Sequence, residues 1–219
     1  MAQKTIAVLG GTGQQGGGIA RRLARANFSV IVGSRDVDRA ANVTAGWRVA
    51  GQTVRTTDYS AAIAAADIIV LAVPFESVAS LLEQHQEQFR PQGLVVDVTV
   101  PLTFTGGTAA LSAIPEGSAS EHIRARLPAH VRLAAAFKTV PAHLLNEIDR
   151  PLACDEFVCG DSAEARAEAA GLIAAMRDLR AVDVGPLARA RAIEHLTLLA
   201  IGINRRHKIH DARFRIVGL

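Results

Sequence analysis

The feature that most constrains the fold is a glycine-rich loop at residues 11–16, set between a short apolar run and a helical pattern. The loop has the full G-x-G-x-x-G spacing and follows directly on the apolar residues Thr5–Leu9. After it, Ile19, Leu23 and Ala26 recur at helical spacing. A strand, a tight glycine turn and a helix in this order predict the first βαβ unit of a sheet that binds a dinucleotide.

Each glycine of the loop has a separate task. Gly11 allows the tight turn, Gly13 lets the backbone approach a pyrophosphate, and Gly16 lets the helix pack closely against the strand. The start of the helix, expected at 16–26, presents unpaired N–H groups and a positive dipole end. We therefore expect bound phosphate groups here rather than a glycine turn that binds nothing.

The residues that follow the second strand distinguish between the two nicotinamide dinucleotides. That strand is expected at Ser29–Gly33, and an NAD-binding fold usually places Asp or Glu at its end to hold the ribose 2′-hydroxyl. This chain has Ser34 and Arg35 there, with Arg39 one helical turn later. A carboxylate would repel a 2′-phosphate, whereas a hydroxyl and guanidinium groups bind one through charge-assisted hydrogen bonds. The sequence therefore predicts NADP(H) over NAD(H).

The rest of the chain alternates short β-branched runs with alanine-rich helical stretches. Asp161 is the expected N-cap of one helix, with Glu164 as its capping-box partner. Further strands are expected at 68–73, 94–98, 131–136, 156–159 and 181–184, and further helices at 36–50, 77–88, 121–127, 161–179 and 188–204. This alternation predicts an α/β fold, a doubly wound parallel sheet of the Rossmann type with a short C-terminal helical appendage.

We expect a dinucleotide-binding domain at 1–187 and a C-terminal helical segment at 188–219. The last helix carries an apolar face. Its members are Ile193, Leu196, Leu199, Ala200 and Ile203. This face has to pack against a second subunit or back on the chain's own sheet, and we expect a homodimer.

Composition excludes several classes of protein. Hydrophobic side chains make up 49% of the 219 residues, enough for one ordinary core. The longest apolar stretch, 61–75, is interrupted by Asp67 and falls short of the ~20 residues that a membrane helix needs. One Trp and one Tyr offer little surface on which bases could stack. With a net charge of +3, we expect an anionic small molecule as partner and neither a membrane nor nucleic acid.

Cysteine and histidine usage is typical of a reducing compartment without a metal centre. Cys154 and Cys159 are an odd number of residues apart, so on one strand they would face opposite sides of a sheet. His207 and His210 form an H-x-x-H motif, but the surrounding positive charge disfavours a bound cation. With no secretory leader expected before the first strand, we expect a cytoplasmic protein with reduced thiols and no metal site.

Six short elements follow one another along the chain. They are Val-Leu-Gly-Gly-Thr-Gly at 8–13, Val-Gly-Ser-Arg at 32–35, Val-Leu-Ala-Val-Pro-Phe at 70–75, Thr-Val-Pro-Ala at 139–142, Cys-Gly-Asp at 159–161 and Gly-Pro-Leu at 185–187. In these elements the chain resembles the NADPH-dependent reductases of the deazaflavin coenzyme F420. The resemblance implies an oxidoreductase that transfers a hydride between NADP(H) and F420.

The resemblance also implies which residues contact each partner. The pyrophosphate would be lined by Thr12, Gly13, Gln14 and Gln15, and the 2′-phosphate held by Ser34, Arg35 and Arg39. The adenosine and nicotinamide portions would be flanked by Val73, Pro74, Ser77, Val100 and Pro101. The deazaflavin ring would meet Lys138, Thr139, Val140 and Pro141.

This sequence departs from the family pattern at two places. Lys138 stands where family members have a histidine, and the glycine-rich residues 14–18 replace the commoner Asn-Leu-Gly. A lysine can donate to a carbonyl of the ring and favour its reduced, anionic form.

Two alternatives stay open beside F420 reduction. One is an NADPH-dependent reductase of a small carbonyl or imine, with Lys138 as proton donor. The other is a non-catalytic protein that senses NADP(H).

Overall fold

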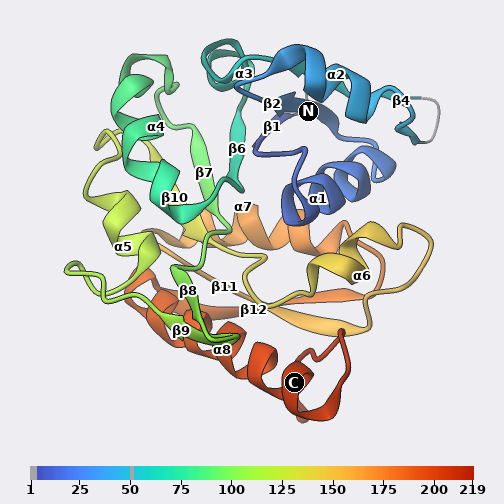
Figure 1. Cartoon of the computed structure of the whole chain (residues 1–219). Helices are drawn as coiled ribbons and strands as arrows, with labels where there is room; N and C mark the ends of the chain where they lie inside the picture. The colour runs from blue at the N-terminus through green and yellow to red at the C-terminus, as the bar shows by residue number, and fades with distance from the viewer. Residues whose placement is uncertain (1–3, 50–51) are drawn as a thin grey trace.

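The chain folds around one eight-stranded sheet. A computed structural model describes residues 4–49 and 52–219 and is drawn in Figure 1. The strand order is β12-β11-β10-β7-β6-β1-β2-β5. The strands are β1 (Thr5–Leu9), β2 (Ser29–Gly33), β5 (Arg55–Thr57), β6 (Ile68–Leu71), β7 (Leu94–Asp97), β10 (Arg132–Ala135), β11 (Cys154–Gly160) and β12 (Leu179–Pro186). Two hairpins lie outside this sheet, β3 (Arg48–Val49) with β4 (Gln52–Thr53) and β8 (Leu102–Thr105) with β9 (Thr108–Leu111).

The predicted doubly wound sheet is confirmed, with one departure. Within the described sheet every neighbouring pair of strands is parallel except β10 with β11, so β11 and β12 run against the others. The chain builds outward from β1 through β2 to β5 and then crosses back to β6 on the other side of β1. Such a reversal of strand order opens a crevice at the carboxyl ends of β1 and β6, where ligands bind in folds of this kind.

Helices cover both faces of the sheet. The helices are α1 (Gln14–Arg25), α2 (Val37–Thr44), α3 (Tyr59–Ala65), α4 (Val78–Gln84), α5 (Ala119–Arg124), α6 (Ala142–Asn146), α7 (Ala163–Ala174) and α8 (Ala190–His207). Residues of α1, α6 and α7 share one apolar core, and residues of α3, α4 and α5 share the other. The last helix, α8, packs beside the second group, over β10, β11 and β12.

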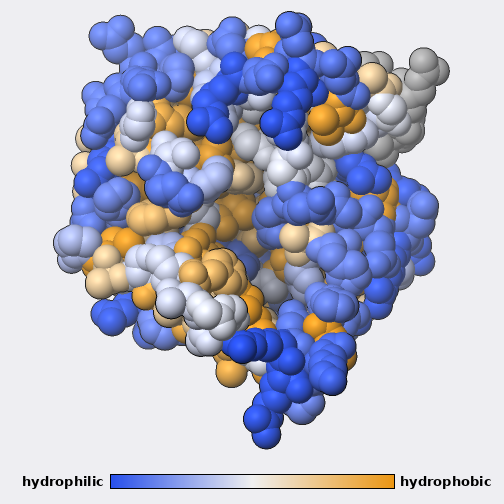
Figure 2. Space-filling model, viewed as in Figure 1, coloured by the Kyte–Doolittle hydropathy of each residue, from blue (hydrophilic) through white to orange (hydrophobic). Residues whose placement is uncertain are grey.

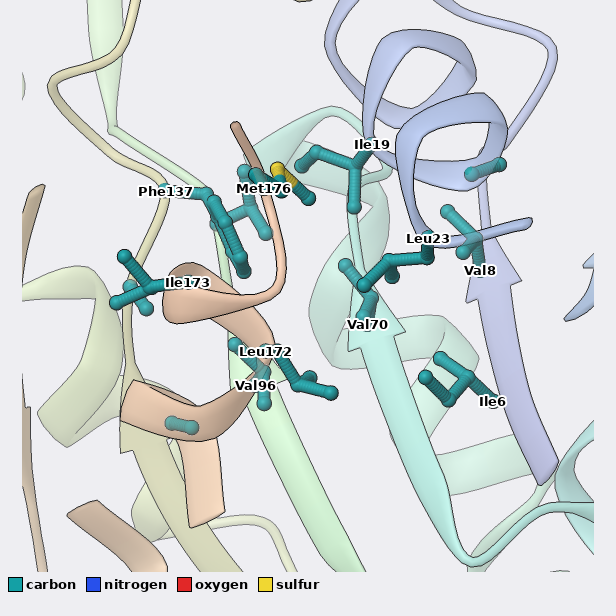
Figure 3. Close-up of a cluster of buried hydrophobic side chains, with 14 of the residues drawn as sticks. Ile6, Val8, Ile19, Leu23, Val70, Val96, Phe137, Leu172, Ile173 and Met176 are labelled. Atoms are coloured by element: carbon teal, nitrogen blue, oxygen red, sulfur yellow. The ribbon is translucent and has the colours of Figure 1, made fainter. Parts of the chain in front are cut away.

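The first of these cores explains why the central strands read as continuous apolar runs. Val8, Val70 and Val96 lie on adjacent strands and point to the same side, where Ile19 and Leu23 of α1 lie near Val8 and Val70 and Leu172 of α7 lies beside Val96 (Figure 3). The residues between them along each strand face the second core, because successive side chains of a strand alternate. A strand buried on both faces has no position at which a polar side chain is favoured.

The helix predicted at 36–50 is wrong in its length. Asp36 is the N-cap of α2, but the helix stops at Thr44 and the chain enters the β3–β4 hairpin. The half-buried Trp47 packs against the core beside α1, and this contact takes the chain out of the helix. Residue 50 of the prediction lies outside the described residues.

The helix predicted at 161–179 is displaced. Ser162, not Asp161, is the N-cap, and its hydroxyl accepts from the backbone N–H three residues on, at 3.1 Å. The Asp161 carboxylate accepts instead from the N–H of Leu133 at 3.0 Å, which ties it to β10. The expected capping box with Glu164 is therefore not formed. The helix ends at Ala174, and the residues from 179 onward belong to the edge strand β12.

Further differences concern the ends of elements and elements without a predicted counterpart, namely β5, α3 and α6. The helix predicted at 16–26 begins two residues earlier, and the one predicted at 77–88 splits into α4 with short 3₁₀ turns at Phe75–Ser77 and Gln86–Gln88. The β8–β9 hairpin forms in the stretch that has no clear pattern in the sequence.

The C-terminal helix shares a core with the sheet. Ile193 packs with Phe157 and Cys159 of β11. Of the predicted apolar face, Ile193 and Ala200 are buried, while Leu199 is 53% exposed. The division at residue 187 stays a prediction. Of the helices that the structure describes, none combines the length and the apolar composition that crossing a membrane requires.

The two cysteines lie as the sequence predicts. Cys154 and Cys159 are both on β11, both buried and both free thiols. They belong to different cores, because the odd separation places them on opposite faces of the strand.

Candidate active site

A cleft of about 610 Å³ opens at the carboxyl ends of the central strands. Its lining includes Gly10, which follows β1, Ser34, which follows β2, and Ala72, which follows β6. Val98 and Lys138 follow β7 and β10 and line its inner end. Figure 2 shows a hollow on this face, with hydrophobic atoms in its floor and strongly hydrophilic side chains along its upper rim. The cleft therefore lies at the crevice that the strand order creates.

The glycine loop forms the middle of the cleft. No side chain caps α1 at its N-cap residue, Gly13, and Thr12, Gln14 and Gln15 beside it line the cleft. The first N–H groups of a helix have no partner inside it, so they are free to bind an anion. Gly16 does not line the cleft. A Cβ there would lie 2.6 Å from the carbonyl oxygen of Gly10, so glycine is required for the helix to start this close to the loop.

Two arginines lie at the outer rim. Arg35 and Arg39 both line the cleft and are exposed. Asp36 lies between them, but its carboxylate caps α2 and accepts from the N–H of Arg39 at 2.9 Å. Ser34 Oγ accepts from the N–H of Asp36 at 3.1 Å. The Asp36 carboxylate is thus turned to the start of α2, and Asp38, the other acid between the two arginines, does not line the cleft. Arg35 and Arg39 bring two guanidinium groups to the rim.

A second pocket of about 540 Å³ adjoins this rim. It shares Arg35, Val73 and Pro74 with the cleft and adds Ser77 and the residues that lead into α4. Tyr59 lines both. Burial raises the pKa of the Tyr59 phenol, and the charge and hydrogen bond of Arg35 offset part of that rise. A flat group of the size of a nucleobase has room beside the rim.

The inner end of the cleft lies over a buried charge cluster. Lys138 Nζ lies 2.7 Å from Asp97 Oδ2 and 3.4 Å from Glu194 Oε1, and it also donates to the carbonyl oxygen of Thr99. The lysine side chain is 0% exposed. Burial alone would lower the pKa of Lys138, but the attraction of Asp97 and Glu194 outweighs it, and the pKa is raised. The ammonium group stays charged, with an acceptor for each of its three hydrogens.

Asp97 is fixed as firmly as the lysine. Its Oδ1 accepts from both the N–H and the hydroxyl of Thr99, each at 2.7 Å, and its Oδ2 also accepts from Ser120 Oγ at 2.6 Å. Glu194 accepts from the N–H of Ala119 at 3.1 Å, and burial raises the pKa of its carboxyl. The cluster therefore ties β7, α5, α8 and the segment after β10 together under the cleft.

A second buried carboxylate, Glu156 of β11, binds the segment that contains Lys138. It accepts from the N–H groups of Lys138 and Val140, each at 2.9 Å, and from Thr139 Oγ1 at 2.8 Å. Burial raises the pKa of Glu156 to about 7, and these hydrogen bonds offset only part of the rise. No strong sequence pattern marks this residue, because Asp155 and Glu156 stand side by side in β11 and the sequence alone does not show which of them is turned toward residues 138–140.

Most of the predicted site residues lie along the cleft. Those that line it are Thr12, Gly13, Gln14, Gln15, Ser34, Arg35, Arg39, Val73, Pro74, Val100 and Lys138, and Ser77 lines the adjoining pocket. Those that line neither of these two hollows are Gly11, Gly16, Pro101, Thr139, Val140 and Pro141. Their assignment as contact residues stays a prediction.

Several lining residues have no counterpart in the prediction from sequence. They are Gly10, Asp36, Tyr59, Ala72, Phe75, Val98, Thr99, Leu102 and Thr197. Most of them flank a predicted site residue by one or two positions. Thr197 belongs to α8 and is brought to the cleft only by the packing of that helix. Among the described residues, no group of three or more His, Cys, Asp or Glu side chains could hold a metal ion.

Comparison with known proteins identifies the family. Residues 5–101 match the family model described as NADP oxidoreductase, coenzyme F420-dependent. The F420-dependent NADP reductase of Methanothermobacter thermautotrophicus is 37% identical, over 98% of this chain and 95% of that protein. The protein of the same name from Methanothermobacter marburgensis is 35% identical, over 98% of both chains. The chain belongs to the F420-dependent NADP reductases. The expected NADP-dependent oxidoreductase, with F420 as its second substrate, is thereby confirmed.

Solved structures agree with this family assignment. A protein of Arthrobacter sp. FB24 that is provisionally named an F420-dependent NADP reductase has a TM-score of 0.84 and 26% identity, over 98% of this chain and 99% of that one. An imine reductase of Bacillus cereus, at 18% identity and a TM-score of 0.64, shares the fold alone.

The carbonyl or imine alternative also needs Lys138 as proton donor. That side chain is buried, and each hydrogen of its ammonium group is bound by a neighbouring acceptor.

Proposed function

We propose that the cleft holds both substrates of hydride transfer between NADP(H) and F420. The observation that carries this is the continuity of one cleft from the guanidinium groups of Arg35 and Arg39, past the glycine loop, to Lys138 and Thr197. The outer part takes NADP(H), with its 2′-phosphate at the rim. The inner part takes the deazaflavin ring, beside Lys138.

The residues of the outer part fit NADP(H). The uncapped start of α1 offers N–H groups to a pyrophosphate. Arg35 and Arg39 offer charge to a 2′-phosphate. Of the two acids between them, Asp36 caps α2 and Asp38 does not line the cleft. When bound, the nicotinamide supplies the hydride or accepts it. The chain's own residues bind the charged parts of the dinucleotide and so fix the position of its ring.

The inner part offers an apolar wall above a buried ion-pair cluster. Val98 and Leu102 line it, and the ammonium of Lys138 lies just beneath. Hydride transfer between two rings depends on proximity and orientation more than on a proton relay. We therefore assign Lys138 a positioning role, in which it holds the strand ends that form the wall, and we assign no proton donor among the side chains.

An absorbance assay tests the proposal. NADPH should bleach oxidised F420 in the presence of the protein, and NADH should do so far less efficiently. If NADPH is oxidised only when a carbonyl or imine compound is added, that compound and not F420 is the second substrate. Tight NADPH binding without turnover on any acceptor would favour a sensor of NADP(H) instead.

We also propose a homodimer in the cytoplasm. Apolar side chains on the β8–β9 hairpin and on α8 remain exposed, among them Phe104 at 66% and Leu199 at 53%. A second copy of the chain would cover them. The two free cysteines suit a reducing compartment. Light scattering measures the mass of the protein in solution, and the mass of a monomer would contradict the proposed dimer.

A further inference from the structure

Residues 137–140 form an irregular segment after β10, and its main chain is held by three side chains from three separate elements. Glu156 of β11 accepts from the N–H groups of Lys138 and Val140, each at 2.9 Å. Thr197 of α8 donates its hydroxyl to the carbonyl oxygen of Lys138 at 2.9 Å. The third side chain, Gln15, comes from the glycine loop. A segment without helix or strand bonds is thus fixed at almost every polar atom.

Gln15 binds the two ends of this segment at once. Its Nε2 donates to the carbonyl oxygen of Phe137 at 2.7 Å and to that of Val140 at 3.3 Å. Phe137 has a φ of 58° and is fully buried. A bulky residue rarely adopts this left-handed conformation, and it persists only where the surroundings hold it. The bond from Gln15 to the Phe137 carbonyl is one of the contacts that hold it.

Gln15 is also part of the dinucleotide end of the cleft. It is the second residue of α1 and lines the cleft in the turn whose free N–H groups face the expected pyrophosphate. Glu156 does not line the cleft, and Thr197 lines it only at the inner end, from α8. Of the three side chains that hold the segment, Gln15 alone is attached to the backbone that NADP(H) would bind.

We propose that Gln15 couples the two substrate sites, so that NADP(H) bound at the start of α1 fixes the side chain that positions residues 137–140 for the deazaflavin ring. The inference rests on the proposed function and adds a mechanism by which one substrate prepares the site of the other. Coupling between two sites is reciprocal, so F420 tightens NADP(H) binding by the same factor. Gln15 is a positioning residue, because its amide reaches the segment and not the reacting atoms.

The test measures F420 affinity with and without the dinucleotide. Oxidised F420 and NADP+ do not react with each other, so the dissociation constant of F420 can be measured from its fluorescence at zero and at saturating NADP+. The wild-type protein should bind F420 about 5-fold or more tightly with NADP+ present, the lower range of typical allosteric coupling. Gln15→Leu keeps the bulk but removes the donor. In this variant the ratio of the F420 dissociation constants without and with NADP+ should fall to about 2 or less, which is a loss of roughly 1 kcal/mol of coupling free energy.

Two further measurements separate coupling from damage. NADP+ affinity of Gln15→Leu is measured alongside, because Gln15 lines the pyrophosphate turn as well as holding the segment. Each F420 dissociation constant is taken at an NADP+ concentration that saturates the variant itself, so that a weaker dinucleotide site does not by itself lower the coupling factor. Thr197→Val removes the bond to the Lys138 carbonyl but leaves Gln15 in place. It should weaken F420 binding equally in both conditions, so that the coupling factor stays at the wild-type value. If Gln15→Leu does not fold, Gln15→Met serves as the second variant.

The outcomes distinguish this inference from the proposed function. A wild-type protein that binds or reduces no F420 contradicts the proposed function itself. A wild-type protein that reduces F420 but shows no tightening by NADP+, or a Gln15→Leu variant that keeps the full factor, overturns only the coupling. Loss of coupling in Thr197→Val as well as in Gln15→Leu would also overturn it, since any loosening of the segment would then suffice.

Discussion

Lys138 and Asp97 form an ion pair that solvent does not reach: Nζ lies 2.7 Å from Oδ2, and both side chains are 0% exposed. The pair joins the end of β7 to the segment after β10. Glu194 of α8 lies 3.4 Å from the same Nζ, so one cation faces two carboxylates. A buried charge is tolerated only while it is paired, which makes the lysine the residue on which this cluster depends.

Replacing Lys138 with Met should destabilise the protein by about 3–5 kcal/mol, because Asp97 and Glu194 would be left buried without a cation. The free energy of unfolding in urea measures this. Lys4→Met is the matched control, since Lys4 pairs with Glu168 at the surface and is 49% exposed. That variant should lose at most about 1 kcal/mol. Equal losses in the two variants would contradict the assignment of Lys138 as the centre of the cluster.

Glu156 should make stability depend on pH. Its carboxyl has an ordinary pKa of 4.5 and a folded pKa of about 7. Between these values the folded protein keeps a proton that the unfolded chain has lost. The free energy of unfolding therefore falls by roughly 3 kcal/mol as the pH rises from about 5 to 7. Above that range the contribution of Glu156 no longer changes with pH.

The measurement is denaturant unfolding of wild type and Glu156→Gln at a series of pH values. Subtracting the two curves isolates the contribution of this carboxyl from that of Glu194 and other groups. The variant should lack the fall between about pH 5 and 7. Glu83→Gln, at an exposed position of α4, should reproduce the wild-type curve. Parallel curves for wild type and Glu156→Gln would show that the carboxyl does not titrate in this range.

The sequence predicts the frame of the fold because that frame depends on local patterns. The strands at 5–9, 29–33 and 68–71 are apolar runs buried on both faces, and the glycine loop has the one conformation that joins the first of them to α1. The prediction is wrong where a distant contact decides. Trp47 ends α2 by packing against the core beside α1, and Asp161 binds Leu133 of β10 instead of capping α7.

The same division holds for the site. Residues 12–15, Ser34, Arg35 and Arg39 could be predicted because they directly follow strands whose ends must meet at one edge of the sheet. Thr197 and Glu156 could not, because their relation to residues 137–140 arises from the packing of α8 and the pairing of β11. The burial of Lys138 is also hidden in the sequence, since its three acceptors come from two distant parts of the chain, Asp97 and Thr99 at the end of β7 and Glu194 of α8.

Replacing Arg35 with Ala should weaken NADPH binding far more than NADH binding. Hydrogen bonds to a charged group contribute about 1.5–3 kcal/mol, so the NADPH dissociation constant should rise roughly 10- to 100-fold while that of NADH changes little. Calorimetry with both dinucleotides measures this. Arg21→Ala removes the same charge from α1, where Arg21 stacks over Trp47 at 5.8 Å, and should leave both constants unchanged. Equal losses for NADPH and NADH in Arg35→Ala would refute the 2′-phosphate site.

Gly18→Ala should lower stability, although alanine is the better helix former. A Cβ at Gly18 of α1 would lie 2.5 Å from the Cβ of Leu145 on α6, and one of the two helices has to move. Gly171→Ala in α7 is the matched control, because a Cβ there meets nothing within 4 Å. It should stabilise the protein by up to about 1 kcal/mol, while Gly18→Ala should destabilise it by about 1–3 kcal/mol in the same urea titration. A gain in both variants would mean that α1 and α6 are less closely packed than the contact with Leu145 requires.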